Sequence, residues 1–301
     1  MTIGRVEEPP GSALPRPAPI EIGGRRFAWG ERTYVMGIVN VTPDSFSGDG
    51  LLGTDDGWVD AAVAQAERMV AEGADLIDIG GESSRPGHVP VAEDVELGRV
   101  VAVIAAVADR LPSTPISIDT TKPSVAAAAI EAGASLVNDI WGVDPDRQLA
   151  RVAAEREIPI VLMHNRAEPR YRGGVIAEVA RDLRVAIDHA VGIGVPIERI
   201  IVDPGFGFGK TAEQNLEVLH DLGDLRMLGR PILLGTSRKS TLGRVTGLPV
   251  DDRLEATLAT TALGIVFGAD IIRAHDVTAN VRVARMTDAI VRGWAEPGAG
   301  E

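Results

Sequence analysis

Hydrophobic residues in this chain gather in short runs that recur at a regular spacing from residue 34 onward. Most runs are apolar, contain β-branched residues and end in a polar cluster. Strands buried on both faces lose the alternation of half-buried strands, so these runs predict buried parallel strands. The eight runs are YVMGIVN (34–40), LIDIGG (76–81), PISID (115–119), SLVND (135–139), PIVLMH (159–164), RIIVDP (199–204), PILLGT (231–236) and DIIRAH (270–275).

Alanine-rich segments separate these runs, and their apolar residues recur at intervals of three and four, which is typical of amphipathic helices. Examples are DAAVAQAERMVAEG, SVAAAAIEAG, VIAEVARDLRVAIDHAVGIG and LEATLATTALGIVFG. Eight strand-then-helix units predict an α/β fold, a (β/α)8 TIM barrel over residues 34–294. A doubly wound sheet is the weaker alternative, because it requires no fixed count of eight and usually comes with a second domain.

Both ends of the chain differ from this pattern. Residues 1–19 hold five prolines and few large apolar residues, which predicts a disordered tail. Within residues 20–33, PIEIGG and RRFAWG predict a short hairpin at the N-terminal mouth of the barrel. Residues 295–301 are expected to form a short C-terminal tail.

Composition limits the classes of function. With 45% apolar and 24% charged residues the chain is typical of a globular protein. A net charge of −13 disfavours nucleic acid and anionic membranes, so an anionic ligand would need a local cluster of cations. The absence of cysteine excludes disulfides, thiolate zinc sites and a cysteine nucleophile. No apolar run reaches membrane-spanning length and no signal peptide pattern occurs, so we expect a cytoplasmic protein.

Polar residues follow nearly every predicted strand. In a (β/α)8 barrel the loops after the strands build the active site, so these residues are expected at one mouth. Any one of them could instead cap a helix or a strand end, and we expect this purely structural role for Asp78 and Asp139. The set is Asn40, Asp78, Glu82, Asp119, Asn138, Asp139, His164, Asp203, Lys239, Arg273 and His275.

Two of these strand ends suit an anion. GTSRKS (235–240) leads into a predicted helix, whose backbone N–H groups and dipole favour an anion, with the Ser237 hydroxyl as a further donor. Arg273 and His275 alternate along the last strand and therefore point the same way. Together with Arg85 they form a candidate cluster for a diphosphate-sized anion. Lys239 is one of only three lysines among 30 Lys and Arg residues.

Seven motifs, in this order, resemble those of the dihydropteroate synthase family: GIVNVTPDSFS, GGESSRPG, SIDTTKP, NDI, DPGFGFGKT, LLGTSRKS and RAHDV. The resemblance covers roughly residues 34–290 and implies a (β/α)8 barrel. It also implies a transferase of folate biosynthesis, which condenses 6-hydroxymethyl-7,8-dihydropterin diphosphate with 4-aminobenzoate to give 7,8-dihydropteroate and diphosphate. In the family's usual mechanism diphosphate leaves first, and the amine captures the resulting pterin cation.

The resemblance also implies roles for individual residues. Asp203 would pair with the N3–H and amino group of the pterin, Asn138 would bind the same ring, and Lys239 would reach its O4 and N5. Asp119 would stabilise the developing cation, which requires its ionised form. The implied pterin-binding residues are Asp119, Asn138, Met163, Asp203 and Lys239, and the implied catalytic residues are Asp119, Lys239, Arg273 and His275.

Further residues are implied for the other ligands. Asn40 would bind Mg2+ through its carbonyl oxygen, while the diphosphate supplies other ligands. The implied diphosphate site consists of Ser84, Arg85, Arg273 and His275, and the implied 4-aminobenzoate site of Pro86, Phe208 and Ser237. Sulfonamides would compete with 4-aminobenzoate, and the family suggests a homodimer.

Some features leave alternatives open. The first loop reads SFSGDG where the family usually has SFSDGG, and Ser84 stands where threonine is common. The altered loop is compatible with a catalytically silent pterin-binding paralogue. A pterin-dependent methyltransferase shares the barrel, but GTSRKS and RAHDV disfavour it, because a reaction without diphosphate has no evident need for two anion sites. Lys122 and Lys210 lie in family motifs without an assigned role.

Overall fold

The strands form one parallel barrel. The computed structural model describes residues 16–41, 57–82, 90–144 and 148–294. Within these ranges the parallel strands lie in the order β8-β7-β6-β5-β4-β3-β10-β9. A bridge between Val202 and Ile232 joins β8 to β9, so the sheet closes on itself. The strands are β3 (Tyr34–Asn40), β4 (Leu76–Gly80), β5 (Ile116–Asp119), β6 (Leu136–Asp139), β7 (Ile160–Met163), β8 (Ile200–Asp203), β9 (Leu233–Leu234) and β10 (Ile271–Ala274).

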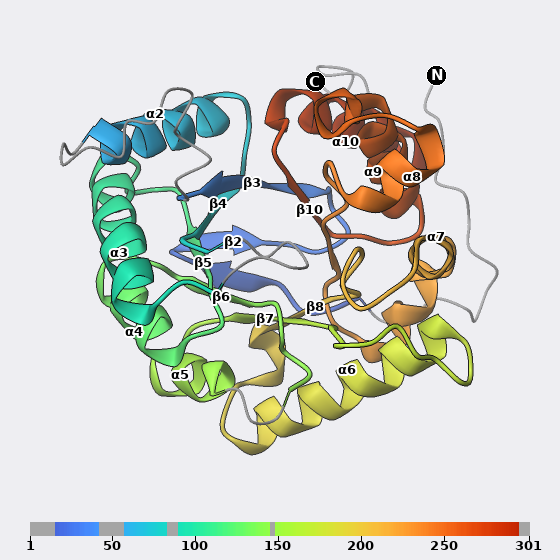
Figure 1. Ribbon diagram of the computed structural model, residues 1–301, viewed down its shortest axis with the longest axis horizontal. Helices are drawn as coiled ribbons and strands as arrows, with labels where there is room; N and C mark the ends of the chain where they lie inside the picture. Colours follow the sequence, from blue (N-terminus) through green and yellow to red (C-terminus); the bar gives the residue numbers. More distant parts are fainter. Residues whose placement is uncertain (1–15, 42–56, 83–89, 145–147, 295–301) are drawn as a thin grey trace, which may run out of the picture.

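Helices surround this barrel, as Figure 1 shows. The four helices predicted above from their apolar periodicity are present as α2, α4, α6 and α9. The helices of the described residues are α2 (Gly57–Ala71), α3 (Glu93–Arg110), α4 (Pro123–Glu131), α5 (Leu149–Glu155), α6 (Val175–Gly192), α7 (Ala212–His220), α8 (Ser240–Thr246), α9 (Leu254–Val266) and α10 (Val277–Val291), with short 3-10 helices η1 (Ile197–Arg199), η2 (Leu222–Leu228) and η3 (Val250–Asp252). The predicted (β/α)8 barrel is therefore confirmed.

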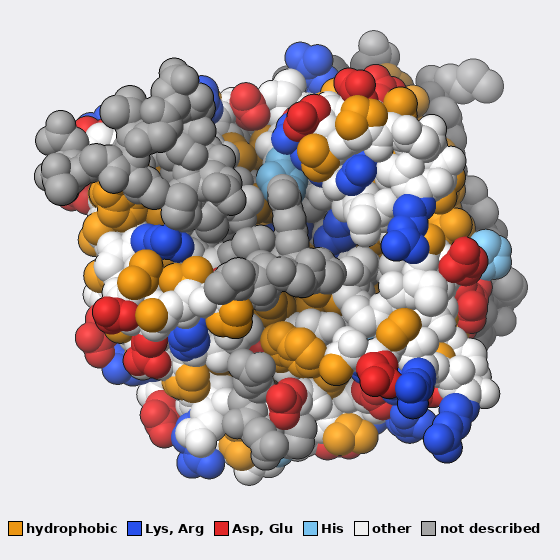
Figure 2. Space-filling model, in the orientation of Figure 1, with side chains coloured by type: hydrophobic (Ala, Val, Ile, Leu, Met, Phe, Trp, Pro, Cys, Tyr) orange, Lys and Arg blue, Asp and Glu red, His pale blue; other side chains and the backbone are white. Residues whose placement is uncertain are grey.

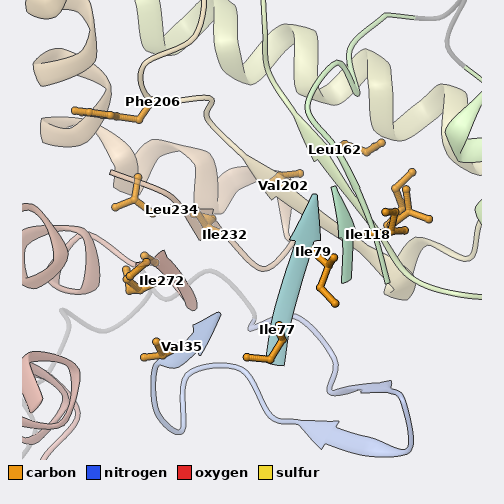
Figure 3. Packing of buried hydrophobic residues seen from close by; sticks show 14 of the residues in the cluster. Val35, Ile77, Ile79, Ile118, Leu162, Val202, Phe206, Ile232, Leu234 and Ile272 are labelled. Atoms are coloured by element: carbon orange, nitrogen blue, oxygen red, sulfur yellow. The ribbon is translucent and has the colours of Figure 1, made fainter. Parts of the chain in front are cut away.

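The strands have apolar side chains on both faces, which explains their continuous hydrophobic runs. Outward residues such as Val35, Ile77 and Ile272 pack under the helices in the larger core cluster, part of which Figure 3 shows. Their chain neighbours Met36, Leu76 and Ile271 belong to a second cluster. Because successive residues of a strand point to opposite faces, this second cluster fills the inside of the barrel.

A hairpin closes the amino end of the barrel, as predicted. Strands β1 (Ile20–Ile22) and β2 (Arg25–Phe27) pair antiparallel. Ile22, Phe27 and Trp29 from this segment are buried in the same cluster as the innermost strand residues. Among the described residues, the amino end of the barrel is thus filled with apolar side chains, while its polar side chains lie at the carboxyl end of the strands.

The predicted tails fall largely outside the described residues. Residues 1–15 and 295–301 are not described, while residues 16–19 have no regular secondary structure. None of the described helices has the length and apolar composition needed to cross a bilayer.

Candidate active site

Polar side chains form a layer inside the barrel, on the carboxyl-end side of the apolar cluster that fills its interior. Asp78, Asp119 and Asn138 lie on three neighbouring strands and occupy the inward positions of β4, β5 and β6. On the other side of the barrel, Met163 and Asp203 are partners in the register of β7 and β8. The carboxyl end of the barrel thus brings together the predicted pterin-binding residues of these strands.

A buried ion-pair cluster connects opposite sides of this layer. The Arg273 guanidinium donates from Nε to Asp78 Oδ2 at 2.6 Å and from Nη2 to Asp119 Oδ2 at 2.7 Å. Asn138 donates from Nδ2 to the same Asp78 oxygen at 3.1 Å. Asp78 is fully buried, and the Asp119 and Asn138 residues are nearly so. Two carboxylates therefore share one guanidinium in a region of low dielectric.

Burial favours the uncharged forms of the acidic and basic groups in this layer. Burial raises the pKa of Asp119 to about 7, although the charge of Arg273 acts in the opposite direction. Burial also raises the pKa of Asp203, opposed first by Lys239. For Lys239, burial lowers the pKa to about 8, opposed by Asp203. Asp119 and Lys239 can therefore change charge near physiological pH, which is common in active sites.

Lys239 lies between two parts of the site. Its ammonium donates to the carbonyl of Phe206 and lies 4.5 Å from the centroid of the Phe208 ring. Asp203 accepts from the backbone N–H of Gly205 at 2.7 Å, in the same loop. The predicted pterin residues Asp203 and Lys239 are thus linked to the predicted aminobenzoate residue Phe208 through one loop.

Ser237 and His275 form a pair that the sequence did not predict. The Ser237 hydroxyl lies 2.9 Å from His275 Nδ1 and accepts from the His275 backbone N–H at 3.2 Å. Beside them, Arg238 has a φ of 58° and pairs with Asp276. The ends of β9 and β10 are therefore joined. Ser240, the first residue of α8, is exposed.

The remaining predicted ligands are only partly described. Ser84, Arg85 and Pro86 lie outside the described residues. Asn40 ends β3 and is half-buried. Among the residues that the structure describes, no cluster of three or more His, Asp and Glu side chains could hold a metal ion.

Asp78, for which a purely structural role is expected, accepts hydrogen bonds from both Arg273 and Asn138 inside the barrel. Its signal was present in LIDIG, where a carboxylate shares the inward face with Leu76. A carboxylate buried at that position needs a cationic or N–H partner inside the barrel.

Lys122 and Lys210, the two lysines without an assigned role, form polar contacts at the same end of the barrel. Lys122 pairs with Glu82 and Glu96, and Glu96 also accepts from the Thr120 hydroxyl at 2.7 Å. Lys210 lies 3.0 Å from His164 Nδ1. These side-chain partners, Glu82, Glu96 and His164, are 26 to 46 residues away along the chain, so local sequence patterns could not reveal them.

These features define a (β/α)8 protein with buried charged side chains at the carboxyl end of its barrel, and the match to a family model makes the class specific. Residues 36–275 match the model of the pterin binding enzymes, and the chain belongs to this family. Within the family it is similar to the dihydropteroate synthase of Clostridium beijerinckii, with 50% identity over 91% of this chain and 100% of that protein. The chain therefore belongs with the dihydropteroate synthases.

Solved structures agree with this assignment. The Xanthomonas albilineans dihydropteroate synthase with 4-aminobenzoic acid has a TM-score of 0.85 and 39% identity, over 93% of this chain and 100% of that one. The Yersinia pestis dihydropteroate synthase in a sulfonamide drug complex has a TM-score of 0.82 and 36% identity, over 90% of this chain and 98% of that one.

Proposed function

We propose that this chain condenses 6-hydroxymethyl-7,8-dihydropterin diphosphate with 4-aminobenzoate, giving 7,8-dihydropteroate and diphosphate. The observation that carries this proposal is the arrangement of Asp203, Asn138 and Asp119 around the barrel mouth, with Lys239 between them and the ring of Phe208. The proposal is supported by the similar protein of Clostridium beijerinckii and the similar structure from Xanthomonas albilineans, both of which are named dihydropteroate synthase.

The pterin would lie flat across the polar layer. Asp203 offers two carboxylate oxygens to a two-donor edge, and Asn138 offers an amide that can both donate and accept. The Lys239 ammonium supplies donors to ring acceptors. Met163, buried beside Asp203 in the register, would contact the ring face. Bidentate pairing of this kind fixes the orientation of the ring as well as its affinity.

The reaction would proceed by departure of diphosphate. The bond between the pterin methylene carbon and the diphosphate oxygen breaks, and the electron pair leaves with the diphosphate. Ionised Asp119 would stabilise the remaining pterin cation electrostatically. The nitrogen of 4-aminobenzoate then forms the new C–N bond and loses a proton. Arg273 and His275, with Ser84 and Arg85, would hold the departing anion.

The amine would be held beside the pterin. Phe208 would contact its ring from one side and Pro86 from the other. Its carboxylate would lie near Ser237 and the start of α8. Because the Ser237 hydroxyl is engaged with His275, the exposed Ser240 is a second candidate donor for the carboxylate.

Magnesium fits this site as an ion that arrives with the substrate. Asn40 supplies one hard oxygen ligand at the end of β3, which suits Mg2+ when phosphate oxygens provide further ligands. When bound, the ion would neutralise part of the diphosphate charge. Asn40 is the residue of this chain that would hold it.

Assembly, location and inhibition follow from the same assignment. We propose a homodimer and a cytoplasmic location. Sulfonamides should compete with 4-aminobenzoate, because both carry an aniline opposite an acidic group. The sulfonamide complex of the Yersinia pestis enzyme supports this expectation.

The test is a steady-state assay of the purified chain with both substrates and Mg2+, following diphosphate and 7,8-dihydropteroate separately. Equal amounts of both products are expected. Binding of the pterin diphosphate without turnover would instead indicate a silent paralogue, and diphosphate release without the second product would indicate hydrolysis.

A further inference from the structure

The loop that follows β8 is held very closely against the segment that follows β7. Gly205, Gly207 and Gly209 all have positive φ. A Cβ atom on Gly205 would lie 1.8 Å from the carbonyl oxygen of His164, and one on Gly209 would lie 2.3 Å from that of Arg166. Only glycine permits this approach together with this backbone conformation. The loop after β8 therefore cannot move closer to the segment that follows β7.

Four backbone carbonyls of this loop accept a hydrogen bond from a side chain. Lys239 donates to Phe206, and the Tyr171 hydroxyl donates to Gly209 at 2.9 Å. The Lys210 ammonium donates to Gly205 at 3.0 Å and to Phe208 at 3.1 Å. Lys210 thereby joins the first and fourth residues of the turn that presents Phe208.

The third donor of Lys210 meets His164. The distance from Lys210 Nζ to His164 Nδ1 is 3.0 Å, so an ammonium there requires an unprotonated Nδ1. The imidazole proton then lies on Nε2, which faces Asp182 Oδ2 at 3.4 Å. Burial lowers the pKa of His164 to about 4, which keeps the ring neutral. The neutral ring accepts from Lys210 through Nδ1, while its Nε2 side lies near the Asp182 carboxylate.

Asp182 is itself held in place. Arg166 donates to its Oδ2 from Nη2 at 2.6 Å and to Glu178 Oε2 at 2.8 Å. The charged groups that face Lys210 are Asp203 on β8, Lys239 before α8, Arg166 after β7 and Asp182 on α6. Helix α6, the segment after β7 and the loop after β8 thus form one connected hydrogen-bonded unit.

We propose that Lys210, oriented by His164 and Asp182, is a positioning residue for the amine substrate. It fixes the turn at residues 205–208, so that the Phe208 ring and the Phe206 carbonyl hold the amine and Lys239 in their reactive positions. The inference rests on the proposed function, since it assigns the amine to Phe208. Lys210 does not touch substrate; it acts through the loop.

The geometry also explains the residue type. Three acceptors surround one nitrogen, which suits the compact ammonium, whereas a planar guanidinium directs its donors apart. The chain uses lysine at only three of 30 Lys and Arg positions. Arginine at position 210 is therefore not expected to restore the loop.

The first experiment measures the kinetics of Lys210→Met and Lys210→Arg. Both variants should raise the KM for 4-aminobenzoate roughly tenfold or more, because the carbonyls of Gly205 and Phe208 lose a donor placed to reach both, and raise that for the pterin diphosphate several times less. Arg170→Met is the matched control, since Arg170 is a largely exposed cation of the neighbouring segment that pairs with Glu168. Equal changes in both KM values, or normal kinetics with arginine, would overturn the proposal.

A chemical rescue separates position from folding. Because the chain has no cysteine, Lys210→Cys would carry a single thiol. Its thiolate can displace bromide from 2-bromoethylamine, which restores an ammonium at nearly the original reach. The proposal requires the KM for the amine to recover after aminoethylation, whereas methylation of the same thiol should give no recovery. Failure of the aminoethylated, folded protein to recover would overturn it.

Amide hydrogen exchange gives a readout that does not depend on turnover. Peptides covering residues 204–211 should exchange faster in Lys210→Met than in the unmodified chain and in Arg170→Met, with other barrel loops unchanged. If the unmodified chain had no synthase activity, the proposed function would fail, yet this exchange would still test the loop. Unchanged exchange in Lys210→Met would contradict the positioning role.

Discussion

At the scale of single residues, Lys239 combines burial with two directed contacts. It donates to the carbonyl of Phe206 and lies over the Phe208 ring, while Asp203 is its first electrostatic partner. We expect Lys239→Arg to lower kcat/KM by about tenfold to a hundredfold, because arginine keeps the charge but is too wide for this position.

The measurement is the steady-state rate with both substrates, together with the melting temperature to verify folding. A correctly folded Lys239→Arg enzyme with near-normal kcat/KM would show that the sign of the charge suffices and that the shape of the donor is unimportant.

Asp119 should give the reaction a pH dependence. Burial raises its pKa to about 7, and its proposed role requires the ionised form. The acid is protonated below this pKa, so kcat/KM should rise with pH through about 7 and fall about tenfold for each pH unit below it. A pH profile of kcat/KM measures this limb.

Asp119→Asn provides the control for this assignment. The amide cannot ionise, so the residual activity of this variant should lack the limb. If the same limb remained, it would belong to another group, such as the substrate diphosphate.

The sequence predicted residues of this site where the strand order alone brings them together. Asp119 and Asp203 each end a strand and Asn138 is the penultimate residue of β6, and the barrel places strand ends at one mouth. The pairing of Ser237 with His275 was not predictable, since it depends on the approach of β9 to β10. The contact of Lys210 with His164 likewise depends on how the loop after β8 packs on the segment after β7.

At the scale of elements, apolar runs predicted all eight strands, but their lengths differ. PILLGT forms only the short strand β9 (Leu233–Leu234), joined to β8 through one bridge at Ile232. An apolar run shows that a segment is buried, whereas strand length depends on register with the neighbouring strands. Register in a closed barrel is a property of all strands together.

The loop after β8 offers a test at this scale. Gly205 and Gly229 both have left-handed backbones, with φ of 68° and 64°. A Cβ on Gly205 would meet the carbonyl of His164, while one on Gly229 would meet nothing within 4 Å. Gly229→Ala should cost about 1 kcal/mol of unfolding free energy from backbone strain alone. Gly205→Ala should cost at least about 3 kcal/mol, because the backbone itself must move.

Chemical denaturation of both variants measures the difference. In addition, Gly205→Ala should raise the KM for 4-aminobenzoate, since Phe208 lies on the same loop. Similar stabilities of the two variants would mean that the loop after β8 can rearrange freely.

At the scale of the whole molecule, the two ends of the barrel have separate tasks. The amino end is closed by the apolar side chains of the hairpin, whereas the carboxyl end carries the polar layer. On the face that Figure 2 shows, acidic and basic side chains of the described residues are interspersed. Despite the net charge of −13, Arg273 and Lys239 both lie at this carboxyl end, where Arg273 is paired with Asp78 and Asp119.

An aspartate holds the closed end together. Asp75 is 4% exposed and precedes β4. It accepts from Arg25 on the hairpin at 2.6 Å, from Arg32 at 2.7 and 2.9 Å, and from the backbone N–H of Val35 on β3 at 2.9 Å. One carboxylate thus connects the hairpin with two strands of the barrel.

Asp75→Asn should therefore destabilise the fold without impairing catalysis. The amide has one acceptor oxygen where the carboxylate has two. It cannot accept from Arg25, Arg32 and Val35 at once, so some of these donors would lose their hydrogen bond. We expect a loss of about 2–3 kcal/mol in unfolding free energy, below the full value for a buried pair because both arginines are partly exposed.

Glu67→Gln, which breaks the exposed pair with Arg110, should cost less than about 1 kcal/mol. Below the melting transition both variants should keep the KM values of the unmodified chain, because this end of a (β/α)8 barrel serves stability. A changed KM in Asp75→Asn would show instead that the closed end influences the site through the barrel interior.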